Sequence, residues 1–242
     1  MASDMDPEVI LYDLACTENV CFSPVVWRIR LLLNYKRIPY RTVFLEFPDI
    51  APTLEGLGIP LGSSPKYTVP AIHHLPTDTF TMDSTPISEL IESLYPDPPV
   101  KLTSKLGNEL LLQARAALGP ISRSLAMPRE IRILSPRAGE FFRSTREAAL
   151  GHRLEDLLDE DKEAQVWTAA DDDIRAVGHL LSTHRGEGPF ILGAQPSYAD
   201  FALAGALQSM RVIDEAMFGR IMRYPGFAEF FDACVPYMQK KN

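Results

Sequence analysis

The spacing of hydrophobic and polar positions changes several times along the first part of the chain. Residues 9–12 form a short apolar run and predict a strand over residues 9–13. Residues 40–44 alternate β-branched or aromatic side chains with polar ones and predict a second strand. Between them, residues 24–35 carry apolar side chains at helical spacing and predict a helix. Residues 69–75 and 79–82 flank a Pro-Thr-Asp turn and predict a β-hairpin.

A further helix and a long irregular segment complete this part of the chain. The helix is predicted from apolar residues at positions i, i+3, i+4 and i+7, namely Ile87, Leu90, Ile91 and Leu94. Residues 48–65 contain four prolines and three glycines, so we expect little regular structure there beyond a short turn near Leu54. The order of elements predicts a small mixed sheet with helices packed on it.

The pattern becomes purely helical after a proline-rich segment at residues 95–99, which predicts a short, stiff linker. Beyond the linker, helical spacing predicts four helices and a last short one, over residues 102–118, 137–158, 172–184, 198–217 and from Phe227 onward. We therefore expect two domains. Residues 1–96 form a mixed α/β domain, and residues 101–242 form an all-helical domain.

Two of the predicted helices begin at capping sequences. Ser23-Pro24 opens the first, because serine is a favoured N-cap and proline suits the first helical position. Beyond this ordinary capping role, such a helix directs free N–H groups and the positive end of its dipole toward the Ser23 hydroxyl, which suits a small anion such as a thiolate or a phosphate. Ser197 and Asp200 form a capping box, so Asp200 is expected to be buried there. The acidic residues 171–173 are expected near another helix N-terminus.

Charge and cysteine content narrow the class of protein. The 242 residues carry 24 basic and 32 acidic side chains, and the net charge of −8 argues against binding to nucleic acid or to an anionic membrane. Three cysteines suit a reducing compartment better than a disulfide scaffold. No apolar run approaches the roughly 20 residues of a bilayer span, and the acidic start resembles neither a secretory signal nor a mitochondrial presequence. We expect a soluble, cytoplasmic protein.

Four short landmarks occur in a fixed order around the proline-rich linker: Ser23-Pro24, Val69-Pro70, Asp83-Ser84 and Ser197-Tyr198-Ala199-Asp200. Each is unspecific alone, but as a set they resemble the cytosolic glutathione transferase family over nearly the whole chain. Residues 40–50 and 65–70 resemble its etherase-related branch, which includes the fungal FuA-like members. The resemblance implies a thioredoxin-like α/β N-terminal domain, an all-α C-terminal helical bundle, and a serine-type transferase.

The resemblance also implies how glutathione is held as a co-substrate. Ser23 is expected to be the catalytic residue that donates a hydrogen bond to the glutathione sulfur, since the thiol pKa must fall before the sulfur becomes a nucleophile. Val69, ahead of a cis Pro70, is expected to pair through its backbone with the cysteinyl part of the tripeptide. Asp83 and Ser84 are expected to hold the ammonium and carboxylate groups of the γ-glutamyl part.

Other implied features are less direct. Lys66 is a candidate for the glycyl carboxylate, beside the simpler interpretation of an exposed lysine. The family usually has glutamate or glutamine where Asp83 stands, so the shorter aspartate side chain is expected to weaken this contact. The resemblance also implies a hydrophobic electrophilic small molecule as the second substrate, in a pocket of the helical domain with candidates at residues 110–117, and it implies a homodimer. No metal is expected, because His73 and His74 are adjacent on a strand and face opposite ways.

Several alternatives stay open at this point. Cys21, Asn19 or backbone amides are rivals for the contact with sulfur, and residues 14–22 either cover the thiol as a lid or move Ser23 away from it. Tyr12 is more simply a core aromatic residue than a catalytic phenol. Besides a detoxifying transferase, the sequence allows a non-catalytic carrier of glutathione or aromatic ligands. It also allows an enzyme of secondary metabolism that uses glutathione for isomerisation or ether cleavage.

Overall fold

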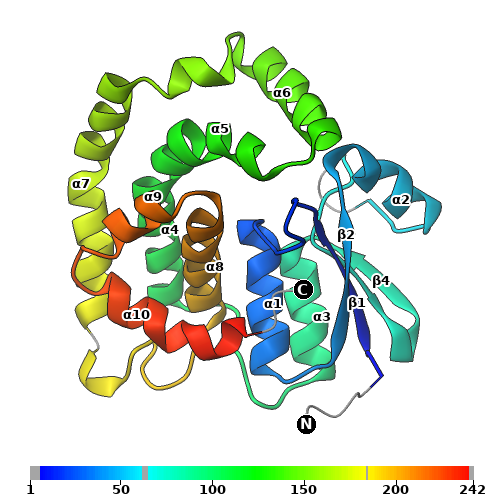
Figure 1. Cartoon of the computed structure of the whole chain (residues 1–242). Coiled ribbons are helices and arrows are strands. Elements are labelled where there is room, and N and C mark those ends of the chain that lie inside the picture. Colours follow the sequence, from blue (N-terminus) through cyan, green and yellow to red (C-terminus); the bar gives the residue numbers. More distant parts are fainter. Residues whose placement is uncertain (1–5, 62–64, 184, 240–242) are drawn as a thin grey trace.

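The structure is a computed structural model, and it describes residues 6–61, 65–183 and 185–239. Within these residues the strands are β1 (Val9–Leu14), β2 (Tyr40–Leu45), β3 (Ala71–His74) and β4 (Thr79–Met82). They form one sheet in the order β2-β1-β3-β4, which lies on one side of the molecule (Figure 1). β1 runs parallel to β2 and antiparallel to β3, and β4 is antiparallel to β3. Every residue of β1 is buried, as suits a strand covered on both faces.

The helices of this half are α1 (Pro24–Tyr35), α2 (Ile50–Gly56) and α3 (Ser84–Leu94). α1 and α3 pack against each other and lie between the sheet and the rest of the molecule (Figure 1). α2 lies apart from them, after β2 and a short 3₁₀ turn at Phe47–Asp49. The predicted strand, helix and hairpin order is confirmed in this half.

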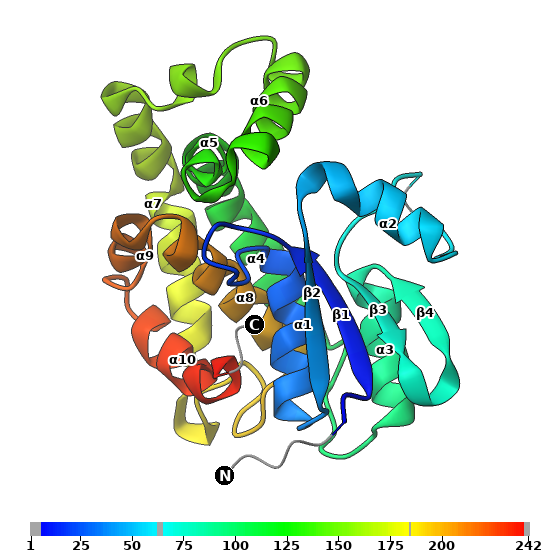
Figure 2. The same cartoon turned by 45° about the vertical axis from the view of Figure 1, so that its right-hand side comes forward.

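The second half of the described chain is helical. Its α-helices are α4 (Lys105–Ile121), α5 (Met127–Glu130), α6 (Pro136–Leu150), α7 (Glu160–Thr183), α8 (Tyr198–Ile213), α9 (Glu215–Ile221) and α10 (Phe227–Cys234). α4 packs against α7 and α8, and α8 packs against α1 of the first half (Figures 1 and 2). The predicted fold class is confirmed: a thioredoxin-like α/β unit is followed by an all-α bundle.

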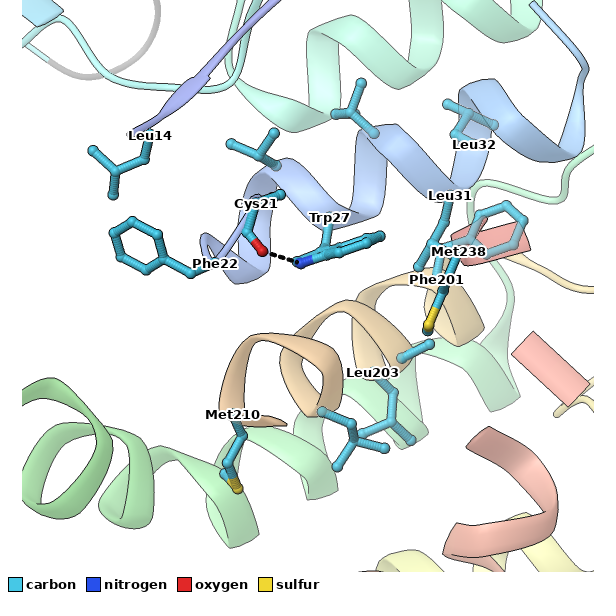
Figure 3. Close-up of a cluster of buried hydrophobic side chains, with 14 of the residues drawn as sticks. Leu14, Cys21, Phe22, Trp27, Leu31, Leu32, Phe201, Leu203, Met210 and Met238 are labelled. Atoms are coloured by element: carbon cyan, nitrogen blue, oxygen red, sulfur yellow. Dashed lines mark hydrogen bonds between the residues drawn. The ribbon is translucent and has the colours of Figure 1, made fainter. Parts of the chain in front are cut away.

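α8 approaches α1 closely because Gly205 has no side chain. A Cβ at this position would lie 2.9 Å from Trp27 Cβ and 3.0 Å from a backbone oxygen of α1. Trp27 is fully buried, and its Nε1 donates a hydrogen bond to the Cys21 carbonyl at 2.9 Å (Figure 3). Ser209 of α8 donates to the Phe22 carbonyl at 2.6 Å. These contacts hold the segment that leads into α1 against the helical half.

The predicted capping box at the start of α8 is confirmed. Asp200 is fully buried, and its carboxylate accepts hydrogen bonds from the Ser197 N–H at 2.7 Å, the Ser197 hydroxyl at 2.6 Å and the Ile191 N–H at 2.9 Å. Burial raises the pKa of the Asp200 carboxyl, while these hydrogen bonds act in the opposite direction. Its carboxylate thus joins the start of α8 to the segment before it, as expected of a buried cap.

Residues 48–65 are more regular than predicted. The 3₁₀ turn at Phe47–Asp49 continues into α2, so the expectation of little more than a turn near Leu54 is wrong. Pro48 and Pro52 are tolerated because both lie in the first turn of their elements, where a backbone N–H would have no intrahelical partner. Part of the segment, residues 62–64, lies outside the described residues.

Two predicted helix boundaries before residue 184 are wrong. α6 ends at Leu150 rather than near residue 158, because Gly151 adopts a left-handed backbone (φ +76°) that terminates the helix. α7 begins at residue 160 rather than 172. Residues 171–173 therefore lie within α7 and not at its N-terminus, and Asp171 pairs there with an arginine one turn later at 2.7 Å.

The predicted helix over residues 198–217 is two helices. Asp214 leaves the helical backbone after α8, and its side chain accepts hydrogen bonds from two N–H groups in the first turn of α9. Residues 122–133, between α4 and α6, form a π turn, the short α5 and a 3₁₀ turn that the hydrophobic pattern did not predict.

In the part of the chain that the structure describes, no helix combines the length and apolar character needed to cross a membrane. The same residues contain no group of three His, Cys, Asp or Glu side chains arranged to hold a metal ion. His73 bonds to Asp78 and His74 bonds to Tyr95, so the two imidazoles have different partners on opposite faces of β3.

Candidate functional site

The strand register brings the predicted site segments to one end of the sheet. Ala71, the first residue of β3, lies opposite Tyr12 near the end of β1 and opposite Met82 at the end of β4. The connection from β1 to α1, the segment before β3 and the residues after β4 therefore meet at this end. They carry the predicted positions Ser23, Val69, Pro70, Asp83 and Ser84.

Ser23 is the N-cap of α1. Its Oγ accepts a hydrogen bond from the Val26 N–H at 3.4 Å, and the residue is 8% exposed. The Ser23 hydroxyl hydrogen has no acceptor among the described residues, so the group still has a donor to offer. Pro24 occupies the first helical position, as predicted. The hydroxyl can therefore cap the helix with a lone pair and donate to an anion at the same time.

Val69 lies two residues before Ala71, the first paired residue of β3. Its peptide bond to Pro70 is cis, as the resemblance implies. Neither the N–H nor the C=O of Val69 makes a hydrogen bond with the described residues. The preceding Thr68 N–H contacts the sulfur of Met82 at 3.3 Å, which holds this segment beside β4. Val69 thus has a backbone donor and a backbone acceptor that the described residues leave unused, which strand-like pairing with an extended peptide would require.

Asp83 occupies the N-cap position of α3 with φ +75°, a conformation that residues with a side chain rarely adopt. Its N–H donates to the Pro70 carbonyl at 3.1 Å, and its Oδ1 accepts from the Thr68 hydroxyl at 3.3 Å. Its Oδ2 is buried and has no partner in the described ranges. A strained backbone and a buried unpaired carboxylate oxygen together indicate a position built for a ligand donor.

Ser84 and Lys66 complete the predicted positions. Ser84 is the first residue of α3 and is buried, and its carbonyl accepts a hydrogen bond from the Tyr198 hydroxyl of α8 at 3.3 Å. Lys66 is exposed on the segment between α2 and β3. The structure thus brings Ser84 to the tip of α3 beside Asp83, and the role of Lys66 stays a prediction.

Cys21 is poorly placed to replace Ser23. The residue is fully buried, and its Sγ lies 3.7 Å from the Ser23 carbonyl oxygen. Burial raises the pKa of the Cys21 thiol well above its usual range, and the neighbouring Asp13 carboxylate raises it further. A thiol of this kind stays protonated at neutral pH, which argues against disulfide exchange at this position.

The remaining rivals have other environments. Tyr12 is buried within β1, and burial raises the pKa of its phenol, as suits a core residue. Asn19 is exposed in a left-handed turn (φ +52°). The segment around it is tied to both halves, because the Ala15 N–H donates to β2 and the Thr17 N–H donates to the Ile133 carbonyl at 2.9 Å.

A buried ion pair under the tip of α1 was not predicted. Arg30 donates to Asp13 Oδ2 through Nε at 2.9 Å and Nη2 at 2.7 Å, and both side chains are 0% exposed. Nη2 also donates to the Thr42 hydroxyl at 3.0 Å. This network links α1 to β1 and β2 and so fixes the position of Ser23. An aspartate in an apolar strand and an arginine among apolar helix residues were the available signals.

A cavity of about 470 Å³ adjoins the start of α1 and lies between α1, α4 and α8. Pro24, next to Ser23, is part of its wall. The apolar wall residues come from α4 and α8: Leu111, Ala114, Leu118, Ala202, Leu203, Ala206, Met210 and Ile213. Leu111, Ala114 and Arg115, from the predicted range 110–117, line this cavity, and the contribution of α8 was not predicted. That the cavity holds the electrophile stays a prediction. Arg28, Arg115 and Glu130 are the charged wall residues.

Comparison with known proteins identifies the family. Residues 22–94 match the family described as "Glutathione S-transferase, N-terminal domain". Residues 113–234 match the family described as "Glutathione S-transferase, C-terminal domain". The chain belongs to the glutathione S-transferase family. The two matches cover parts of both halves of the fold. Ser23, Val69 and Asp83 all lie within the N-terminal match.

Relatives of this transferase-family chain include fungal proteins. It is 34% identical over 218 residues to the glutathione S-transferase-like protein ustS of Aspergillus flavus, covering 83% of this chain and 78% of that protein. Its structure is similar to that of glutathione transferase GSTFuA3 from Phanerochaete chrysosporium, with a TM-score of 0.85, 28% identity, and coverage of 99% and 100% of the two chains.

A second solved structure is a glutathione S-transferase of Ceriporiopsis subvermispora in complex with glutathione. It has a TM-score of 0.84 and 27% identity, and covers 97% of this chain and 99% of that chain. These neighbours support the resemblance to the fungal FuA branch.

Proposed function

We propose that this chain is a serine-type glutathione transferase that joins the sulfur of glutathione to an electrophilic, mostly apolar small molecule. One observation carries the proposal: unused hydrogen-bonding groups gather at one end of the sheet. They are the Ser23 hydroxyl hydrogen, the backbone N–H and C=O of Val69, and Asp83 Oδ2. The glutathione-bound relative from Ceriporiopsis subvermispora adds support.

In this proposal the tripeptide docks as an extended strand beside Val69, whose backbone pairs with the cysteinyl part. Asp83 Oδ2 accepts from the γ-glutamyl ammonium group, and the N-terminus of α3 at Ser84 receives the neighbouring carboxylate. Lys66 is the candidate for the glycyl carboxylate. The cysteinyl sulfur then lies at the tip of α1, where the Ser23 hydroxyl donates to it.

The tip of α1 supplies enough free energy to ionise the thiol. Lowering a thiol pKa by about two units requires about 2.7 kcal/mol. A hydrogen bond to a charged group contributes roughly 1.5–3 kcal/mol, and the helix dipole contributes about 0.3–1 kcal/mol at the N-terminus. Ser23 and the first turn of α1 are therefore sufficient without a histidine base.

The cavity beside Pro24 is the proposed site of the electrophile. The thiolate attacks an electrophilic carbon there and forms a carbon–sulfur bond, while the displaced electron pair leaves with a leaving group or is protonated after an addition. The mostly apolar wall favours an apolar substrate body. The domain limits of residues 1–96 and 101–242, the homodimer and the cytoplasmic location belong to the same proposal.

The same cavity also favours a second candidate function, a carrier of aromatic ligands that does not conjugate them. Its volume of about 470 Å³ lies in the range of small-molecule sites. A carrier binds dyes or phenols with negligible conjugation of model electrophiles. An isomerase or ether-cleaving enzyme is distinguished by its products, because it regenerates or oxidises glutathione.

Calorimetry of glutathione binding with Asp83→Asn tests the proposed docking. We expect the variant to bind glutathione about tenfold or more weakly, since it loses a charge-assisted hydrogen bond. A glutathione analogue without the amino group should bind the variant and the wild type alike. Asp78→Asn is the matched control, because Asp78 is also an aspartate with positive φ but lies on the exposed hairpin turn.

Two outcomes count against the proposal. If the folded wild type takes up no glutathione at millimolar concentration, the function is rejected. If Asp83→Asn binds glutathione as tightly as the wild type, Asp83 is not the ammonium partner.

A further inference from the structure

The charged residues that line the cavity, Arg28, Arg115 and Glu130, lie on three different helices. Arg28 lies on α1, five residues after Ser23, which corresponds to about 7.5 Å along the helix axis. It lines the cavity, and its Nε is buried without a partner among the described residues. No hydrogen bond or ion pair joins the Arg28 guanidinium to the residues in the described ranges. An arginine in this state has donors to offer to a ligand.

The other charged wall residues do not neutralise Arg28. Arg115 of α4 is also cationic and is exposed. Glu130 of α5 is the acidic residue of the wall, and burial raises the pKa of its carboxyl to about 7 while Arg146 acts to lower it. Arg28 is not among the groups that perturb Glu130. The cavity thus has a positive wall at α1, and its carboxyl group lies elsewhere.

Arg28 as a whole is half-buried, but its buried Nε–H has no partner among the described residues, and this carries a desolvation cost that an anionic ligand of the guanidinium would offset. Its planar fork of N–H donors matches the two oxygens of a carboxylate. We propose that the electrophile of this protein carries a carboxylate that pairs with Arg28, on an otherwise apolar body. This inference rests on the proposed function, because it takes the cavity as the electrophile site. It adds a substrate class that a mostly apolar wall alone would not indicate.

Ser23 caps α1 and Arg28 lies within it, so their positions define the orientation of such a substrate in the cavity. Its reactive carbon faces the sulfur at the tip of α1, and its carboxylate lies a little more than one helical turn further along. The apolar side chains of α4 and α8 cover the body between the two ends. The carboxylate points to α1 and not to Glu130, because two negative charges repel each other.

Ethacrynic acid and its methyl ester are suitable probes, since both are aryl vinyl ketones and only the acid has a carboxylate. The glutathione thiolate adds to the terminal vinyl carbon and forms the carbon–sulfur bond. The electron pair of the carbon–carbon double bond moves to the carbonyl oxygen as an enolate, which then takes a proton from water at the α-carbon. No oxidant or reductant is involved.

We expect the wild type to have a higher kcat/KM for the acid than for the ester. In Arg28→Gln the ratio of kcat/KM for the acid to kcat/KM for the ester should fall about tenfold or more. The saturated analogues, which cannot react, should show the same preference in calorimetry without turnover. Arg41→Gln removes the same charge from an exposed position on β2 and should leave the ratio unchanged.

Equal acid and ester constants in the wild type would overturn the inference while the proposed function stands, because the ester is still conjugated. An equal loss for both probes in Arg28→Gln would also overturn it, by assigning Arg28 to the fold or to the glutathione sulfur. If the wild type conjugates neither probe and binds neither saturated analogue, the cavity is not an electrophile site. Failure to bind glutathione itself would instead reject the proposed function.

Discussion

At the residue scale, Ser23 serves two purposes with one hydroxyl group. A lone pair of its Oγ caps α1 through the Val26 N–H, and its hydrogen is left for a ligand. The Asp13–Arg30 ion pair below it is fully buried and links α1 to the central strand. In the proposed function this donor is held in place before glutathione binds, so little reorganisation would be needed to stabilise a thiolate.

Glu130 gives a prediction for the pH dependence of stability. Burial raises the pKa of its carboxyl from 4.5 to about 7 in the folded protein. The folded state therefore holds this proton more tightly than the unfolded state does, and stability falls as the pH rises from about 4.5 to about 7. We expect Glu130→Gln to raise the free energy of unfolding by about 1–3 kcal/mol at pH 8, where wild-type Glu130 is ionised.

Urea unfolding at pH 8 and near pH 4 checks this prediction. At the lower pH the wild-type carboxyl is protonated in both states, so the two proteins should be equally stable. Glu89→Gln, at an exposed position of α3, is the matched control and should have little effect at either pH. A stabilisation by Glu130→Gln that is the same at both pH values would contradict the prediction.

Residue positions were predictable where they belong to a local motif. Ser23 is the N-cap of a helix, Val69 precedes a proline, and Asp83 stands just before a helix. The strand register brings the three positions together. Arg28 and Glu130 were missed, because their positions in the cavity wall depend on which face of a helix points into a cavity formed by elements that are distant in the sequence. No pattern within one element contains that information.

At the element scale, the contact of α8 with α1 decides where the tip of α1 lies. We expect Gly205→Ala to destabilise the protein by about 1–3 kcal/mol, because its Cβ would overlap Trp27 and the backbone of α1. Gly219→Ala in α9 is the matched control, since a Cβ there meets nothing within 4 Å. The control should gain about 0.5–1 kcal/mol from the better helix propensity of alanine.

Thermal or urea unfolding of the two alanine variants distinguishes these cases. The Gly205 variant should also conjugate model electrophiles more slowly, because α8 forms one wall of the cavity. Equal stability changes for the two variants would show that the α1–α8 approach tolerates a methyl group.

Helix and strand boundaries were predicted best where a cap is local. α1 and α8 begin as predicted, at Ser23-Pro24 and at the Ser197 capping box. The first half of α7 was missed because it is highly charged, with buried side chains only at Trp167 and Ala170 before residue 171. α7 as a whole packs against α4, a tertiary contact that stabilises the helix and that the sequence pattern does not show.

At the scale of the whole molecule, the two halves also pack together through aromatic and charged side chains, away from the α1–α8 contact. Phe47, before α2, packs against Phe142 of α6 with ring centroids 5.3 Å apart, and the Arg146 guanidinium lies over both rings. Arg137 of α6 pairs with Glu46 and Asp49. α6 extends toward the α2 side of the sheet (Figures 1 and 2). Nothing in the spacing of either segment predicted this contact.

Adjacent phenylalanines on α6 provide a test of this second contact. Phe142 is 1% exposed and Phe141 is 41% exposed. We expect Phe142→Ala to cost about 3–5 kcal/mol of unfolding free energy, and Phe141→Ala to cost less than about 1 kcal/mol, as a largely exposed side chain does. Urea unfolding measures both, and similar losses in the two variants would contradict the packing described for α6.

The most direct test of the central claim is the ultraviolet absorbance of the glutathione thiolate, titrated against pH in the saturated complex. We expect the pKa of bound glutathione in the wild type to lie about two units below that of the free thiol. In Ser23→Ala it should return most of the way to the free value. Ser104→Ala, which removes the corresponding cap of α4, should leave the thiolate pKa unchanged. A bound thiol that titrates like free glutathione, or identically in the wild type and Ser23→Ala, would contradict the claim that the tip of α1 activates the sulfur through Ser23.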